Sequence, residues 1–90
     1  MKPEECKRVY GIDPRDVEGM MGWWVVDETT AVRAAKKGGE RVQPGMLAIL
    51  VKGGVDTSWA PAKVNFVHEQ VFYETGVRVL YFRKQWWREK

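Results

Sequence analysis

Residues 62–90 read AKVNFVHEQVFYETGVRVLYFRKQWWREK and contain two runs of β-branched and aromatic residues, separated by Thr75-Gly76. Residues of these types favour extended strands over helix. Gly76 can adopt a positive φ without steric cost, so a two-residue turn at this point would place Phe72 opposite Val79. A three-residue loop would slip the register by one position. The stretch therefore predicts a long antiparallel hairpin.

The two faces of this hairpin are both expected to carry apolar side chains, so part of each face should be covered. One face would carry Phe66, Phe72, Val77, Val79 and Tyr81, and the other would carry Val67, Val71, Leu80 and Phe82. The polar run from His68 to Gln70 interrupts both faces and predicts a β-bulge or a local kink.

The N-terminal third of the chain predicts short elements. Residues 2–10 form either a short helix opened by Pro3 or an ordered tail, and Gly11 ends it. Asp13 is a good N-cap, and Pro14 suits the first helical position that follows it. The spacing of Val17, Met20 and Met21 would give this second helix a short apolar face.

The middle of the chain predicts a strand, a helix and a second strand. Residues 22–26 contain two tryptophans and two valines after Gly22, and Asp27 follows them as an N-cap for a helix over residues 28–37. Gly38-Gly39 ends that helix. Residues 46–51 are continuously apolar, which is typical of a central strand covered on both faces.

The order of these elements predicts one α+β domain over residues 1–90. We expect a small four-stranded, mostly antiparallel sheet with one or two short helices on one face and a C-terminal hairpin. The strands that flank the helix over residues 28–37 could lie parallel through a right-handed crossover. The alternative is a small, strongly curved barrel formed by residues 46–87.

Five tryptophans occur as Trp23-Trp24, Trp59 and Trp86-Trp87. Adjacent residues on a strand point to opposite faces, so one member of each pair is expected to lie outside the main core.

The positive charge is concentrated at the C-terminal end. Residues 77–90 hold five basic residues and one acid, a charge of +4, which leaves −1 on the other 76 residues of a chain whose net charge is +3. The candidate binding residues are Arg78, Tyr81, Arg83, Lys84, Trp86, Trp87 and Arg88, with Trp23 and Trp24 as a second surface.

Three roles fit this basic, aromatic strand. Tryptophan, tyrosine and arginine on an edge strand are typical of hot spots, which favours a protein partner or a second copy of the chain. Cations and aromatic rings also bind phosphates and stack on bases in single-stranded nucleic acid. The third alternative involves no binding: lysine and arginine only protect a sheet edge from aggregation.

The sequence gives little support for a catalytic site or a metal site. The chain has one cysteine, Cys6, and one histidine, His68, 62 positions apart, whereas a metal site needs three or four suitable ligands. No phosphate-loop or nucleophile motif is present. We therefore expect a non-enzymatic interaction module without a cofactor, with nucleic-acid binding as the alternative and a small enzyme as the third class. The single cysteine and the short apolar runs favour a cytoplasmic protein with no membrane partner.

Overall fold

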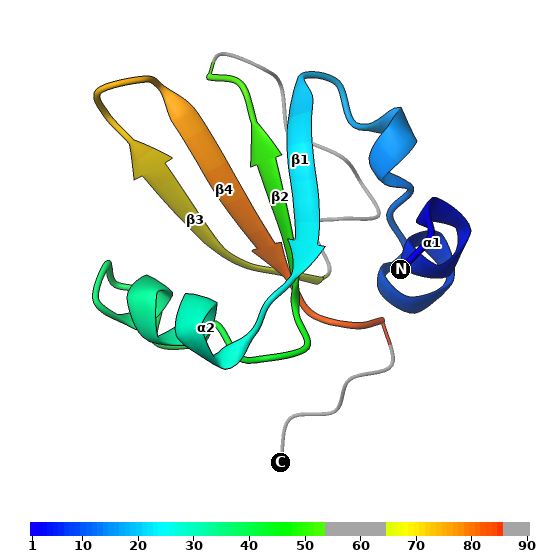
Figure 1. Ribbon diagram of the computed structural model, residues 1–90, viewed down its shortest axis with the longest axis horizontal. Coiled ribbons are helices and arrows are strands. Elements are labelled where there is room, and N and C mark those ends of the chain that lie inside the picture. The colour runs from blue at the N-terminus through cyan, green and yellow to red at the C-terminus, as the bar shows by residue number, and fades with distance from the viewer. Residues whose placement is uncertain (54–64, 86–90) are drawn as a thin grey trace.

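The computed structural model describes residues 1–53 and 65–85. Its elements, in chain order, are α1 (Pro3–Tyr10), the 3-10 turn η1 (Pro14–Asp16), β1 (Met20–Val25), α2 (Glu28–Ala35), β2 (Leu47–Val51), β3 (Phe66–Phe72) and β4 (Val77–Phe82). The strands form one sheet in the order β1-β2-β4-β3 (Figure 1). The predicted α+β class and the four-stranded sheet are confirmed.

Every pair of neighbouring strands is antiparallel. The predicted parallel crossover between the strands around α2 is therefore wrong. Backbone hydrogen bonds fix the antiparallel arrangement, because Val26 N–H donates to the Met46 carbonyl and Gly45 N–H donates to the Val26 carbonyl, at 2.8 and 2.9 Å. The end of β1 thus lies beside the start of β2. The sheet is open and does not close into the barrel that was considered as an alternative.

The two faces of the sheet carry separate hydrophobic clusters, and each cluster includes one helix. Cys6 and Tyr10 of α1 pack with Leu47, Ile49 and Val51 on one face. Ala34 of α2 packs with Ala48, Val79 and Tyr81 on the other. The helices therefore lie on opposite faces rather than on one face, because the side chains of β2 alternate and are apolar in both directions. This pattern also confirms β2 as a central strand.

Both helices begin at the predicted signals and α1 ends at the predicted glycine, whereas α2 ends at Ala35, two residues before the predicted end. The carboxylate of Asp27 accepts a hydrogen bond from Thr30 N–H at 2.7 Å and caps α2. Gly11 ends α1 with a φ of 76° and donates to the Lys7 carbonyl at 2.8 Å. Asp13 caps only the short turn η1, and the apolar residues that were predicted to extend this helix, Met20 and Met21, instead open β1.

The predicted hairpin is present, but its turn is longer than two residues. Phe72 pairs with Val77, and the Phe72 carbonyl accepts from Gly76 N–H at 2.8 Å. The register therefore differs by two positions from the prediction, which leaves the faces of residues 70–82 unchanged because side chains alternate with a period of two.

A bulge lies between Phe66 and His68, next to the polar run where one was predicted. It reverses the facing of the residues before it. Phe66 therefore pairs with Phe82 and contacts its ring edge-on, with centroids 5.7 Å apart, on the face opposite to the predicted one. Val67 likewise moves to the α2 face, where it packs against that cluster.

Candidate functional site

The basic, aromatic strand is β4, and it is an inner strand of the sheet. It pairs with β2 on one side and with β3 on the other, so the prediction that it forms an edge is wrong. Tyr81 is only 3% exposed and lies in the α2-side cluster, where its ring cannot stack on a base. Arg78 is half-buried and donates to Glu69 of the neighbouring strand at 3.4 Å.

Arg83 and Lys84 follow β4 and are half-buried. Arg83 N–H donates to the Asn65 carbonyl, and Gln85 N–H donates to the Val9 carbonyl, both at 2.9 Å. The end of β4 is therefore held against the C-terminal end of α1. Three of the predicted binding residues, Trp86, Trp87 and Arg88, lie outside the described residues, as does Trp59.

The second predicted surface, Trp23-Trp24, lies on β1, which is one of the two edge strands. Trp23 packs against the cluster on the α1 side. Trp24 faces the α2 side, belongs to neither cluster and is 36% exposed, and its neighbour Val25 is 40% exposed. The expected division of this tryptophan pair is thus confirmed, and an exposed indole lies at a sheet edge.

The sequence of β1 is MMGWWV, six residues without a charge or a proline. Among the described residues β1 pairs with β2 alone. Val26 faces β2 through its hydrogen bond to Met46, and paired residues alternate along an antiparallel ladder. The peptide N–H and C=O groups of Trp23 and Val25 therefore point away from β2, toward the outside of the sheet.

The other edge strand, β3, carries features that oppose pairing. Both edge strands contain a bulge, between Met20 and Gly22 in β1 and between Phe66 and His68 in β3, but only β3 has polar residues in its middle, at His68, Glu69 and Gln70. Charged side chains are one of the devices by which native sheets block an exposed edge. Of the two edges, β1 is the one whose composition leaves it open to another strand.

Carboxylates flank β1 at both ends. Asp16 and Glu18 precede it, Asp27 and Glu28 follow it, and all four residues are exposed. Residues 13–28 hold five carboxylates and one arginine, a charge of −4 within a chain of net charge +3.

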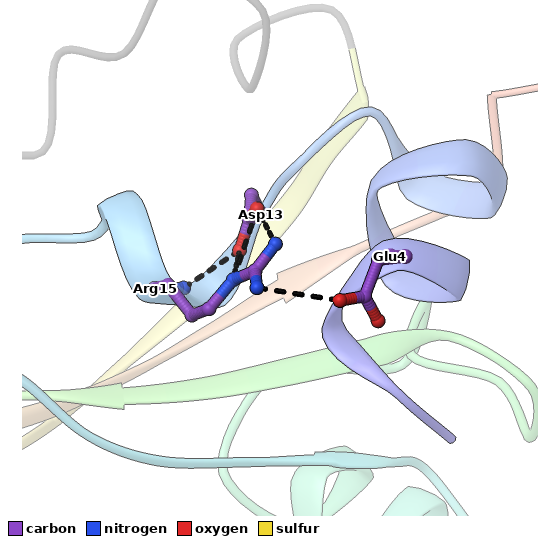
Figure 2. Close-up of polar contacts among 3 residues, drawn as sticks. All are labelled: Glu4, Asp13 and Arg15. Atoms are coloured by element: carbon purple, nitrogen blue, oxygen red, sulfur yellow. Dashed lines mark hydrogen bonds and ion pairs between the residues drawn. The ribbon is translucent and has the colours of Figure 1, made fainter.

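The one arginine of this segment is already engaged. Figure 2 shows Arg15 between two carboxylates, with its Nη2 2.7 Å from Asp13 and its Nη1 3.3 Å from Glu4. Hydrogen bonds from Arg15 lower the pKa of the Asp13 carboxyl to about 2 and, in return, raise the pKa of the guanidinium. Lys52 lies near the start of β1, since its N–H donates to the Gly19 carbonyl. At the other end, Arg33 of α2 lies close enough to Asp27 to help lower the pKa of its carboxyl. Within residues 13–28 themselves, the five acids outnumber the single arginine.

On its face of the sheet, α2 leaves an area uncovered beside β3 and the β3–β4 turn. A hollow of about 770 Å³ lies there, lined mainly by residues 69–75, and the other side chains around it include Met21 of β1, Leu50 and Val77. Met21 is 52% exposed and connects this hollow to the β1 edge. Contiguous exposed apolar surface marks sites where proteins interact with other proteins, ligands or membranes.

The only cysteine and the only histidine lie on opposite sides of the sheet. Cys6 is buried on the α1 side, and burial raises the pKa of its thiol to about 11, so the thiol is protonated at neutral pH. The ring of His68 stacks on Tyr81 with centroids 6.0 Å apart, on the α2 side. The two side chains cannot form a catalytic pair.

Within the described ranges no group of three potential ligands gathers around a metal position. Neither helix in that part of the chain has the length and apolar content needed to cross a membrane. Comparison with known proteins gives no match, because no family model fits the chain and no curated protein or solved structure is significantly similar to it.

Proposed function

We propose that this domain is a non-enzymatic, cytoplasmic interaction module that binds an extended segment of another polypeptide at the β1 edge. The observation that carries the proposal is an uncharged edge strand whose outward-facing peptide groups, at Trp23 and Val25, have an exposed Trp24 between them. An added strand would form main-chain hydrogen bonds with these groups, which is the binding mode called β-augmentation.

Side chains on both faces support this binding mode. Trp24 points to the α2 side, whereas Val25 points to the α1 side, where it lies opposite Leu47. An added strand would therefore find one exposed apolar side chain on each face of the sheet. Tryptophan at a partly exposed edge is typical of a residue that contributes strongly to binding.

The test is a selection from a library of peptides about ten residues long, a length that spans an edge strand. Val25→Pro removes an outward-facing N–H without removing a hydrogen bond to β2, and proline is tolerated at sheet edges for this reason. The matched control is Val71→Pro on the β3 edge. Val71 also faces outward, because the neighbouring Phe72 faces β4.

We expect the selected peptides to bind the unchanged domain and Val71→Pro, and to lose binding to Val25→Pro. Val25→Lys is a second test of the same edge, because it changes the side chain and keeps the backbone N–H. Circular dichroism checks that each variant is folded. Peptides that bind all variants equally would contradict the proposal.

A second candidate, nucleic-acid binding, is favoured by one contact. Gln85 joins the end of β4 to α1, which brings the segment with Arg83 and Lys84 to the helix end that carries Lys7 and Arg8. Four cations in one region could hold a phosphate backbone, and such binding weakens steeply with salt. Retention of a single-stranded oligonucleotide at low salt, lost in Lys7→Gln together with Lys84→Gln, would favour this candidate over strand addition.

A further inference from the structure

The two ends of β1 limit what kind of strand can pair with it. Asp16 and Glu18 lie at one end, Asp27 and Glu28 lie at the other, and Arg15 is held by Asp13 and Glu4. A pairing strand would extend along the apolar run and bring its own ends close to these carboxylates. Opposite charges across a strand pair stabilise it, and like charges destabilise it.

A second copy of the chain supplies no cation to this edge. Suppose that two β1 strands pair antiparallel around a two-fold axis at Trp23. Glu18 of each copy then faces Glu28 of the other. An axis at Trp24 instead places Glu18 opposite Thr30 and Glu28 opposite Met20. Self-pairing in these registers therefore leaves the carboxylates at both ends without an opposite charge across the strand pair.

We infer that the partner of the β1 edge is a cationic strand, meaning an extended segment with an apolar middle and lysine or arginine at both ends. This inference rests on the proposed function and names the chemistry of its ligand. The apolar middle would contact Trp24 on one face and Val25 on the other. The basic ends would meet Glu18 and Glu28, and long cationic side chains can reach these carboxylates from neighbouring positions.

Charge also gives the domain a way to select its partner. The chain outside residues 13–28 carries a net charge of +7, whereas residues 13–28, which include β1, carry −4. Such an arrangement directs a basic segment to one place and increases the rate of association at low salt.

The experiment uses three fluorescein-labelled synthetic peptides with the same middle, Thr-Val-Thr-Val-Thr-Val. They differ only in having two lysines, two glutamines or two glutamates at each end. Fluorescence anisotropy measures their binding to the full chain at low and high salt. We expect the lysine peptide to bind about tenfold or more tightly than the glutamate peptide at low salt, and this preference to shrink at high salt.

A double variant and a control variant locate the preference. Glu18→Gln with Glu28→Gln should weaken the lysine peptide by about two- to fivefold for each carboxylate that is removed. The control is Glu40→Gln, because this exposed acid follows Gly39, which lies against His68 of β3 at the other side of the sheet. The control should leave the affinity unchanged, and Val25→Pro should abolish binding of the lysine peptide.

The other outcomes separate this inference from the proposed function. If the three peptides bind equally and all depend on Val25, strand addition stands and the cationic partner is overturned. A dimer in sedimentation that Val25→Pro dissociates would also overturn it, because the occupant would then be a second copy. If the lysine peptide binds Val25→Pro as well as the unchanged chain, both proposals fail.

Discussion

The two edge strands of the sheet, β1 and β3, differ in how well they are protected from pairing with another strand. Both strands contain a bulge, but β3 also places polar residues in its middle and pairs Glu69 with Arg78 of the next strand. β1 has neither a charge nor a proline and exposes Trp24 and Val25. An unprotected edge is an aggregation hazard unless another strand covers it. The contrast within one sheet is the reason to assign binding to β1.

The largest loss of stability should come from a substitution in an inner strand, because the inner strands support both edges. Ile49 is fully buried and lies between Trp23 of β1 and Leu80 of β4. Ile49→Ala should lower the free energy of unfolding by about 2–5 kcal/mol, through lost burial and the cavity that remains. Denaturant unfolding measures this change, and Leu50→Ala, at a half-buried position of the same strand, should cost less. Equal losses would contradict the assignment of Ile49 to a closed core.

Two glycines, one against β3 and one on β1, show how closely each edge of the sheet is packed, and substituting them should have smaller effects on stability. A Cβ at Gly39 would lie 2.8 Å from the ring of His68 on β3 and 3.0 Å from the Ala34 carbonyl. A Cβ at Gly22 on β1 would meet nothing within 4 Å. Neither glycine has a positive φ, so the space around each decides the outcome.

Gly39→Ala should therefore destabilise the domain by about 1–3 kcal/mol, since overpacking forces the backbone or the ring to shift. Gly22→Ala should stabilise it by about 0.4–1 kcal/mol, because it restricts the unfolded chain. Thermal unfolding of the two variants measures both signs. The same sign in both would show that the two edges are packed alike.

The smallest expected effect on stability comes from the ion pair between Asp13 and Arg15, which lies beside β1. The pKa of Asp13 is about 2 in the folded chain, below its ordinary value of 3.8. The stabilisation from its ionised form is therefore complete above pH 3.8 and is lost as the pH falls through about 2.

Asp13→Asn should flatten the dependence of unfolding free energy on pH across this range, as should Arg15→Gln, which removes the main cause of the shift. Urea unfolding at several pH values tests this expectation. A slope that neither substitution changes would contradict the role given to the pair.

Local signals predicted much of the fold. The cap at Asp27, the stop at Gly11 and the apolar strand over residues 46–51 each follow from side-chain chemistry close in sequence. The order of the strands does not, because it depends on which strands pair across the whole chain. Arg78 and Tyr81 therefore looked like edge residues, although β4 lies inside the sheet.

The proposed binding edge, β1, has a signal in the sequence that the distribution of charge obscured. The run MMGWWV is uncharged and carries the Trp23-Trp24 pair, which the sequence identified only as a second surface. The concentration of cations after residue 76 drew attention to β4 instead. The register of the hairpin was also missed, since a four-residue turn and a two-residue turn share the same glycine signal at Gly76.

Amide hydrogen exchange at the two edges, with and without the lysine-ended peptide, tests the central claim most directly. The account predicts that the amides of Trp23 and Val25 exchange quickly in the free domain and slow by about tenfold or more on binding, as local opening is suppressed. The amide of Val71 on β3 should not change. Protection that appears at Val71, or near Arg83 and Lys84, while Trp23 and Val25 stay unprotected, would contradict the account.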